Sequence, residues 1–317
     1  MVGKIGCYRL YVYVPTKLYE CLCRIVGEYF MKKQTYLHGL KLLALDLDGT
    51  TMRSDNTLSY EVKTAIQKAC KSGIEVVVAS GRPYGSMPKE ILEIKEINYV
   101  ISSNGASIHD KTGKILKSYL LDENDVLKFL KITQEYDIIL EAFINGKTYT
   151  DRRYAENPIK YGCTEAYLGY VQANHGNIDD MRAFIYEHRN ELDSIEYVCT
   201  EKNLREKIRH QVEENINGFY VTSSSENFVE MMDKSATKGN AVKWLCDYLK
   251  IDLKATCACG NADNDIDMIK LAGLGVAVKN ATPLCLKSAD IIVESNDENG
   301  VSKLVELLIN EKMYKLF

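Results

Sequence analysis

Hydrophobic and polar positions alternate along this chain in short blocks that predict strands and helices in turn. The apolar runs Leu42–Asp46, Ile74–Ala79 and Tyr99–Ser102 each end at polar or glycine residues, as buried strands do. Between the first two, the apolar positions of Ser59–Lys71 recur at helical spacing, and Gly73 follows as a helix-ending residue. This alternation predicts a parallel sheet covered by helices on both faces.

The same alternation returns near the C-terminal end of the chain. The expected elements there are, in order, helix Thr237–Tyr248, strand Ala255–Cys259, helix Asn264–Leu271, strand Leu274–Val278, helix Pro283–Lys287, strand Ile291–Val293 and helix Val301–Leu308. We interpret the two runs as parts of one α/β core.

Residues 122–224 separate the two runs and have a different character, with more charge, more tyrosine and longer helices. The expected elements are helices Ile178–Glu191 and Asn203–Glu214 and strands Ile138–Phe143, Lys147–Asp151, Ile195–Val198 and Phe219–Thr222. We interpret this stretch as an inserted α+β domain. The predicted division is an N-terminal extension at 1–36, a core at 37–121 and 225–317, and the insert at 122–224.

The first thirty residues have two interpretations. Apolar positions from Leu18 to Phe30 fall on one helix face, as in a docking or membrane-surface helix. Alternatively, the natural start is Met31 and residues 1–30 are an extension without catalytic role, which we favour. Pro15 and Lys17 interrupt the apolar run before this helix and no small-residue cleavage site follows, so we expect no signal peptide.

The composition of the chain argues against several classes of protein. The chain has 317 residues, of which 46% are hydrophobic and 26% charged, as in a soluble globular protein of two domains. A net charge of −4 does not favour a nucleic-acid partner, and no apolar segment is long enough for a membrane helix. The ten cysteines include no C-x-x-C pair, and we expect Cys257 and Cys259 to be buried rather than zinc-bound. We expect a cytoplasmic protein; the oligomeric state cannot be read from the sequence.

Asp46 and Asp48 are the first candidates for chemistry. They follow a predicted strand on the same side, because alternate strand residues share a face, and Gly49 lets the chain turn away. Two carboxylates at a strand end suit a hard cation such as Mg²⁺, and one can act as nucleophile while the other moves protons. An acidic turn without chemistry is the alternative, since Asp and Gly are common in turns.

Three further clusters lie where predicted strands end or helices begin, and ligands of open α/β sheets bind at the carboxyl ends of strands. Ser80-Gly81-Arg82 can hold phosphate oxygens at a helix N-terminus. Lys238 at a helix start opposes the helix dipole, which suggests an anionic partner. The cluster Gly260–Asp265 offers oxygen ligands for a metal. Each also has an ordinary interpretation as a helix cap, a surface residue or a solvated turn.

Taken in order, these residues resemble the motifs of the haloacid dehalogenase-like (HAD) phosphatase superfamily, specifically its Cof-type branch. The matching segments are Asp46-Leu47-Asp48-Gly49-Thr50, Ser80-Gly81-Arg82-Pro83, Lys238-Gly239, the turn Ser103-Asn104-Gly105-Ala106, and Gly260–Met268, which is similar to G-D-x-x-N-D-x-x-M. The resemblance covers roughly residues 41–310. It implies a Rossmann-like parallel-sheet core with an inserted α+β cap domain.

The resemblance also implies a Mg²⁺-dependent phosphomonoester hydrolase for small phosphorylated metabolites such as sugar phosphates. Asp46 would be the nucleophile that forms an aspartyl-phosphate, and Asp48 would protonate the leaving alcohol and then activate water. The implied phosphate-binding residues are Ser80, Gly81, Arg82, Asn104, Lys238 and Asn264. The implied Mg²⁺ ligands are Asp46, Asp48 through its backbone carbonyl, Asn261 and Asp265.

Asn261 departs from the family pattern, which has an acidic residue after the glycine of this motif. An asparagine keeps a carbonyl oxygen for Mg²⁺ but carries no charge, so we expect weaker Mg²⁺ binding than an aspartate would give. Two alternative functions stay open: a phosphomutase or phosphotransferase on the same scaffold, and a phosphate-ligand-binding protein whose catalysis has decayed.

Residues of the inserted domain at 122–224 would determine which substrate the protein prefers. Its sequence contains no motif that names a ligand, although four tyrosines either line a sugar pocket or belong to the domain core: Tyr149, Tyr154, Tyr161 and Tyr167.

Overall fold

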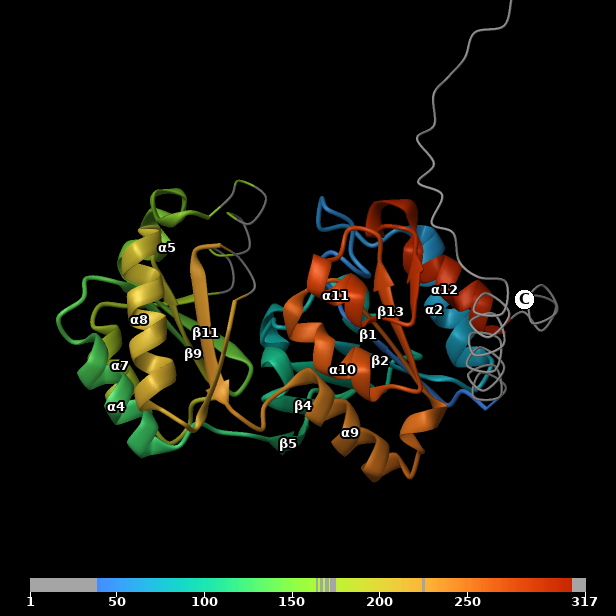
Figure 1. Ribbon diagram of the computed structural model, residues 1–317, viewed down its shortest axis with the longest axis horizontal. Coiled ribbons are helices and arrows are strands. Elements are labelled where there is room, and N and C mark those ends of the chain that lie inside the picture. Colours follow the sequence, from blue (N-terminus) through green and yellow to red (C-terminus); the bar gives the residue numbers. More distant parts are fainter. Residues whose placement is uncertain are drawn as a thin grey trace, which may run out of the picture.

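The computed structural model describes residues 39–309 except 164, 166, 167, 169, 170, 172–174, 224 and 225. The predicted extension at 1–36, with its helix, lies outside the described residues, as does Tyr167. The described chain forms two units, an α/β core and an α+β cap, that lie beside each other (Figure 1).

An eight-stranded sheet forms the core, in the order β14-β13-β12-β1-β2-β3-β4-β5. Its strands are β1 (Leu42–Leu45), β2 (Glu75–Ala79), β3 (Tyr99–Ser102), β4 (Ser107–Asp110), β5 (Ile115–Ser118), β12 (Thr256–Gly260), β13 (Leu274–Val278) and β14 (Ile291–Val293). The strands from β14 to β3 run parallel, which confirms the predicted fold class. β4 and β5 extend the sheet antiparallel, and the sequence analysis missed them.

Helices cover both faces of this sheet, as predicted. They are α2 (Tyr60–Lys71), α3 (Lys89–Leu92), α9 (Lys238–Leu249), α10 (Ile266–Leu271), α11 (Pro283–Ser288) and α12 (Gly300–Ile309). Leu43 and Leu45 of β1 pack with Ile66 of α2, whereas Leu42 and Ala44 face the other way into a cluster with α9. Because both faces are covered, all four residues of β1 are buried, and the strand has a continuous apolar run.

The helix expected directly after Ser80-Gly81-Arg82 is replaced by shorter elements. A single 3₁₀ turn, η1 (Tyr84–Ser86), follows Pro83, and α3 begins only after Pro88. Proline disfavours helical backbone in the residue before it, and Met87 is extended with φ −67° and ψ 141°. The Ser80-Gly81-Arg82 segment therefore leads into a tight loop and not into the N-terminus of a regular helix.

A six-stranded sheet forms the cap, in the order β10-β11-β9-β6-β7-β8. Its strands are β6 (Ile139–Ile144), β7 (Lys147–Asp151), β8 (His175–Ile178), β9 (Ser194–Val198), β10 (Phe219–Thr222) and β11 (Phe228–Asp233). Neighbours run antiparallel except β7 and β8. Since β11 belongs to this sheet, the cap continues past residue 224, where the sequence analysis placed its end.

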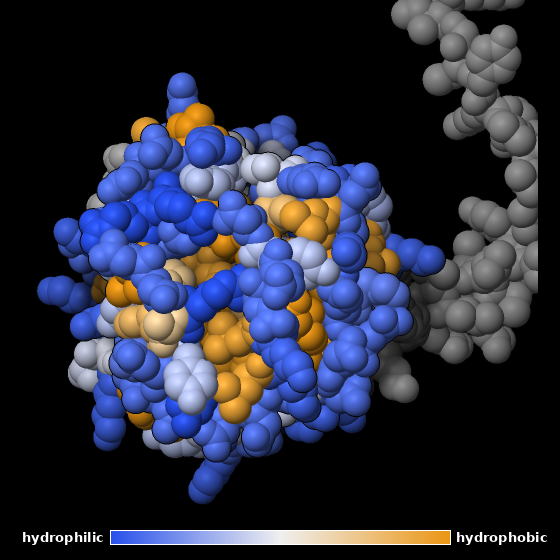
Figure 2. Space-filling model, turned by 90° about the vertical axis from the view of Figure 1, so that its left-hand side faces the viewer, coloured by the Kyte–Doolittle hydropathy of each residue, from blue (hydrophilic) through white to orange (hydrophobic). Residues whose placement is uncertain are grey.

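Helices cover one face of the cap sheet, while the other face turns toward the core (Figure 1). The covering helices are α4 (Glu123–Thr133), α7 (Met181–Glu187) and α8 (Lys202–Asn215), and α5 (Arg152–Glu156) follows β7. The helix expected at Ile178–Glu191 is shorter, because Ile178 ends β8 and the Asp180 carboxylate caps α7 by accepting from Ala183 N–H. The end of the molecule that the cap forms is largely hydrophilic, with hydrophobic side chains between (Figure 2).

The structure also bears on the predictions about the cysteines and about membrane-spanning helices. Cys257 and Cys259 are fully buried in β12, as predicted. Within the described ranges, no helix is long and apolar enough to cross a membrane.

Candidate active site

The end of β1 places Asp46 and Asp48 at the carboxyl edge of the parallel sheet. The N–H of Asp46 donates to the Cys259 carbonyl at 3.0 Å, which continues the ladder between β1 and β12. Gly49 then turns the chain with φ +79°, a value that favours glycine. Thr51 Oγ1 donates to the Asp46 carbonyl at 2.5 Å and so fixes the turn, a contact that the sequence did not indicate.

Lys238 joins two carboxylates in the interior. Its Nζ donates to Asp46 Oδ1 and to Asp265 Oδ1, each at 2.7 Å, and all three side chains are buried. A buried ammonium is stable only beside such partners. The Thr237 hydroxyl caps α9, the helix that Lys238 begins.

Asp265, a predicted Mg²⁺ ligand, accepts from protein donors with both of its carboxylate oxygens. Its Oδ1 accepts from Lys238, and its Oδ2 accepts from the backbone N–H groups of Asn261 and Ala262 at 2.9 and 3.0 Å. Both oxygens are therefore engaged with protein donors. Asp265 thereby orients Lys238 and the turn after β12.

The charges at this point do not balance, because one ammonium serves two buried carboxylates. Burial and the neighbouring Asp265 raise the pKa of Asp46 to about 7, against the opposing effect of Lys238. The two carboxylates raise the pKa of Lys238, although burial alone would lower it. The site therefore favours either a proton on a carboxylate or a further cation.

Asn261 reaches the free side of Asp46. One terminal atom of its amide lies 2.9 Å from Asp46 Oδ2, 3.1 Å from the Asp48 carbonyl oxygen and 3.0 Å from Thr50 Oγ1. With the amide nitrogen at this position, Asn261 donates to all three atoms. With the amide oxygen there, the carboxylate and the two carbonyl oxygens converge on one point.

This convergence fits Mg²⁺. Oxygen ligands at 2.0–2.1 Å in an octahedron are about 2.9 Å apart along each edge, close to the spacing found here. The three candidate ligands are Asp46 Oδ2, the Asp48 carbonyl and Asn261 Oδ1. Of these three ligands, only Asp46 Oδ2 belongs to a carboxylate, and among the residues that the structure describes no group of three His, Cys, Asp or Glu could hold a metal.

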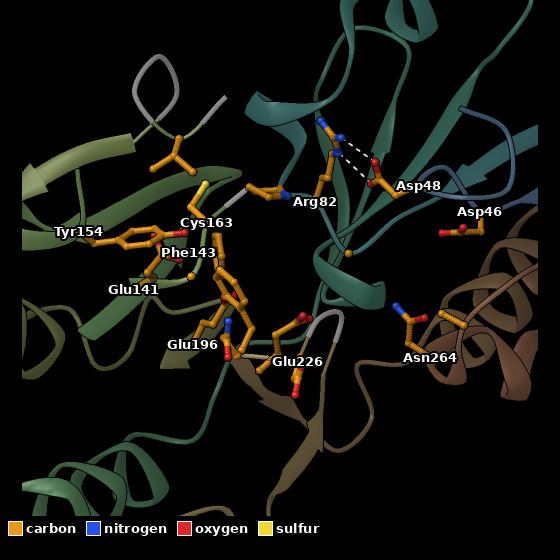
Figure 3. A pocket seen from close by; sticks show the side chains of 18 of the residues that line it. Asp46, Asp48, Arg82, Glu141, Phe143, Tyr154, Cys163, Glu196, Glu226 and Asn264 are labelled. Atoms are coloured by element: carbon orange, nitrogen blue, oxygen red, sulfur yellow. Dashed lines mark hydrogen bonds and ion pairs between the residues drawn. The ribbon is translucent and has the colours of Figure 1, made fainter. Parts of the chain in front are cut away.

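Arg82, a predicted phosphate-binding residue, forms an ion pair with Asp48. Its Nε and Nη2 donate to Asp48 Oδ2 and Oδ1 at 2.8 and 2.6 Å, a bidentate pair (Figure 3). The Arg82 backbone N–H donates to Ser80 Oγ at 3.1 Å, and Ser80 is buried. The pair holds the carboxylate of Asp48 at the edge of the cavity described below.

Asn104 connects the core motifs to the cap. Its Oδ1 accepts from Asn264 Nδ2 at 2.8 Å, its Nδ2 donates to Glu230 Oε2 at 2.5 Å, and its N–H donates to the Ser80 carbonyl at 3.0 Å. Asn104 has φ +54°, in the left-handed region that Asn tolerates. The contact with Glu230 was not predicted, because that residue lies outside every motif.

A cavity of about 480 Å³ lies between the core and the cap and opens on Asp46 and Asp48. Its lining residues come from both units: Asp46, Asp48, Gly81, Arg82, Pro83, Glu141, Phe143, Tyr154, Gly162, Cys163, Val171, Glu196, Glu226, Asn227, Phe228, Glu230, Asn261, Ala262 and Asn264. Of the tyrosines considered above, Tyr154 lines the cavity, whereas Tyr149 packs on Phe184 with ring centroids 4.8 Å apart. Tyr161 stands edge-on to Tyr154.

Three glutamates are among the lining residues that sequence reasoning missed: Glu141, Glu196 and Glu230. A signal was present for two of them, because Glu141 and Glu196 each interrupt an otherwise apolar strand that was predicted correctly. Such a charged residue inside a strand marks a face that is not packed against the domain core.

A parallel α/β core with an inserted cap, and with these motifs at the carboxyl edge of its sheet, defines a phosphatase of the HAD type. The sequence model of the haloacid dehalogenase-like hydrolase family matches residues 43–305, and the chain belongs to this family, in its Cof-type branch. The chain is 30% identical over 292 residues to phosphatase YwpJ of Bacillus subtilis, a match covering 85% of this chain and 100% of YwpJ.

Two further comparisons agree. The 5-amino-6-(5-phospho-D-ribitylamino)uracil phosphatase YwtE of Bacillus subtilis is 26% identical over 299 residues, covering 86% of this chain and 99% of YwtE. The solved structure of a haloacid dehalogenase-like hydrolase from B. subtilis has a TM-score of 0.72 at 30% identity, covering 85% of this chain and 100% of that one. The protein is accordingly an enzyme, a phosphatase of the HAD superfamily.

Proposed function

We propose that this phosphatase hydrolyses small, sugar-phosphate-like metabolites in a Mg²⁺-dependent reaction that passes through an aspartyl-phosphate on Asp46. One observation carries the proposal: the two oxygens of Asp46 have different partners. Oδ1 accepts from Lys238 at 2.7 Å, and Oδ2 faces the Asn261 amide at 2.9 Å. One oxygen is thus available to attack while the other stands in the corner that fits a cation.

The two oxygens of Asp46 would then have separate roles in the first step. Asp46 Oδ1 attacks the phosphorus, the bond between phosphorus and the leaving oxygen breaks, and Asp48 delivers a proton to the leaving alcohol. Lys238 remains beside the attacking oxygen and offers its positive charge to the phosphoryl oxygens. Ser80 Oγ accepts from Arg82 N–H, which leaves its hydroxyl proton for a phosphoryl oxygen.

In the second step Asp48 takes a proton from a water molecule, which attacks the phosphorus and releases inorganic phosphate and the free Asp46 carboxylate. Bound Mg²⁺ would neutralise charge on the phosphoryl group from the side of Asp46 Oδ2. Asp48 must separate from Arg82 to carry the proton, so substrate entry has to compete with the bidentate pair.

The size of the cavity supports a small substrate. A volume of about 480 Å³ lies within the range of small-molecule sites, and the cap closes it opposite the reacting carboxylates. The relative YwtE is named for a substrate with a phosphorylated ribityl chain, which is a phosphorylated polyol. Both observations favour a metabolite over a phosphoprotein or a nucleic acid.

Phosphate release tests the proposal. The natural chain and Asp46→Asn are assayed on sugar phosphates and p-nitrophenyl phosphate, with Mg²⁺ and with a chelator. We expect release that requires Mg²⁺ and is abolished in Asp46→Asn. A folded natural chain that releases no phosphate at high Mg²⁺ contradicts it. Transfer of the phosphoryl group to an added sugar, in place of release, would identify the alternative phosphotransferase.

A further inference from the structure

The Asn104 turn (Ser103–Gly105) holds the loop that carries Ser80. The Asn104 N–H donates to the Ser80 carbonyl at 3.0 Å, and the Ser103 N–H donates to the Arg82 carbonyl at 2.9 Å. These two backbone hydrogen bonds fix the path of the loop. The position of the Ser80 hydroxyl, which the proposed mechanism uses for a phosphoryl oxygen, therefore depends on the turn.

The backbone of the Asn104 turn is strained. Ser103, Asn104 and Gly105 have φ values of +48°, +54° and +103°, three left-handed residues in succession, a conformation that only glycine adopts freely. Such backbone persists only where its surroundings hold it, and it is frequent at functional sites. A Cβ on Gly105 would lie 3.0 Å from the Lys238 backbone nitrogen, so the turn also packs on the start of α9. It thus lies against the segments of both Ser80 and Lys238.

The side chain of Asn104 connects this turn to the cap. Its Nδ2 donates to Glu230 Oε2 at 2.5 Å, and its Oδ1 accepts from Asn264 Nδ2 at 2.8 Å. Glu230 belongs to β11 of the cap sheet and lines the cavity. Figure 3 shows Asn264 on the core side of the cavity, as is Asp46. A cap residue thereby holds an amide that belongs to the reaction centre of the core.

The Glu230 carboxylate determines which way the Asn104 amide faces. A carboxylate accepts hydrogen bonds, so it selects the amide nitrogen as its neighbour. The amide oxygen is then turned to Asn264, from whose NH₂ group it accepts. A reversed Asn104 amide would place its oxygen against the carboxylate and its nitrogen against the Asn264 nitrogen, and both bonds would be lost. Both bonds therefore depend on Glu230, which is 6% exposed.

We propose that Glu230 is a positioning residue for phosphoryl transfer: through Asn104 it keeps the Asn104 turn, and with it Ser80, in the arrangement that the reaction needs. Because Glu230 acts from the cap, the reaction centre is complete only while the cap sheet lies against the core. The inference rests on the proposed function, since it assumes that Ser80 and Lys238 bind the phosphoryl group. Small displacements of such groups are costly in the transition state.

Glu230→Met removes the acceptor and keeps a side chain of similar length. We expect kcat to fall about tenfold or more with KM little changed, because a hydrogen bond to a charged group is lost and the effect is on the transition state. The loss should be equal for p-nitrophenyl phosphate and a sugar phosphate, since the turn acts on the phosphoryl side. Direct contact of Glu230 with the leaving alcohol would instead raise KM for sugar phosphates alone, an outcome that contradicts the inference.

An exchange of donor and acceptor tests the hydrogen bond itself. Asn104→Asp sets two carboxylates against each other, and we expect a loss of kcat at least as large as that of Glu230→Met. The double variant Asn104→Asp/Glu230→Gln reverses donor and acceptor, while the other oxygen at position 104 still accepts from Asn264. We expect its kcat to recover about tenfold over that of Asn104→Asp. No recovery in a folded double variant overturns the inference.

Asn104→Asp/Glu230→Met is the matched control for charge. It removes the repulsion between the carboxylates but offers no donor, so its kcat should stay low. Recovery equal to that of the Glu230→Gln double variant would assign the loss to repulsion and contradict the inference. Glu187→Gln, on an exposed position of α7, should leave kcat unchanged. Should Glu230→Met fold poorly, Asn104→Asp and its double variant with Glu230→Gln decide the question alone.

Hydrolysis of p-nitrophenyl phosphate by the natural chain separates the two proposals. If this ester is hydrolysed with Mg²⁺ and folded Glu230→Met has the same kcat as the natural chain, the inference is wrong and the phosphatase function stands. If the natural chain hydrolyses no ester, the proposed function fails, and the inference that depends on it fails as well.

Discussion

The amide of Asn261 and the carboxylate of Asp46 meet at 2.9 Å, at the corner where the Asp48 carbonyl also points. This relationship gives Asn261 two possible states. Its NH₂ group can bond the oxygens directly, or its carbonyl oxygen can join them as the third ligand of a cation. The amide therefore competes with the cation for Asp46 Oδ2, which adds to the loss of one negative charge.

We expect Asn261→Asp to bind Mg²⁺ more tightly, with the half-saturating concentration lowered about tenfold or more, because the added charge attracts the ion and the competing NH₂ group is gone. Calorimetric titration of the natural chain and the variant measures this without any substrate. Equal half-saturation would show that Asn261 does not weaken the site.

In the absence of metal, we expect the same variant to be less stable than the natural chain. A second carboxylate beside Asp46 Oδ2 adds like-charge repulsion to a buried site, so Asn261→Asp should melt at a lower temperature than the natural chain in a chelator. Added Mg²⁺ should raise its melting temperature by more than that of the natural chain. A melting temperature that does not respond to Mg²⁺ in either protein contradicts the assignment of this corner.

Lys238→Met should destabilise the fold strongly. It leaves the Asp46 and Asp265 carboxylates buried without their shared ammonium, a change that costs about 3–5 kcal/mol. Urea denaturation at pH 8 measures the loss. Lys128→Met is the control, since Lys128 is more than half exposed and its pair with Asp125 contributes little. A loss no larger than that of the control would refute the buried triad.

Mg²⁺ affinity should depend on pH through Asp46, whose pKa is raised to about 7. Mg²⁺ needs the ionised carboxylate, so affinity should rise about tenfold per pH unit below 7 and level off above it. Calorimetry at pH 6, 7 and 8 measures the affinity and the released proton. Identical affinities at pH 6 and 8 would contradict the raised pKa.

The stability of the metal-free protein should show the reverse dependence. Because the folded pKa of Asp46 lies above its ordinary value of 3.8, the folded state binds the extra proton, and this contribution is lost as pH rises toward 7. Asp46→Asn has no such proton. Its stability should therefore fall less than that of the natural chain between pH 5 and 8, as measured by urea denaturation in a chelator.

Gly105→Ala should disturb the site from a distance. Gly105 has φ +103°, and a Cβ there would lie 2.3 Å from the Thr237 carbonyl oxygen, next to Lys238. The clash must move the start of α9, so we expect both lower stability and a large loss of phosphate release. Gly73→Ala is the matched control, since Gly73 has φ +84° with nothing within 4 Å of its Cβ position. Equal losses of activity in the two variants would rule out the clash as the cause.

The sequence by itself determined the elements whose signals are local. The apolar runs that became β3 and β13 and the helical period of α2 depend on side chains only a few positions apart, and each element has the predicted type. The pairing of Asp46 and Asp48 could also be predicted from the sequence, because strand geometry places both residues at one end of β1. The weakly patterned strands β4, β5 and β11 were missed, since their pairing with neighbours defines them more than their own composition does.

Only the tertiary structure decided what these residues contact. Lys238 reaches Asp46 across 192 positions of sequence, and it shares Asp265, which the sequence suggested as a metal ligand. Arg82 similarly binds Asp48, although the motif suggested phosphate. The place of Glu196 in the cavity wall depends on the register of β9 with β6 and β11, because a shift of one residue would turn its side chain to the opposite face of the sheet. Contacts between distant segments follow from packing and register, and no local pattern encodes them.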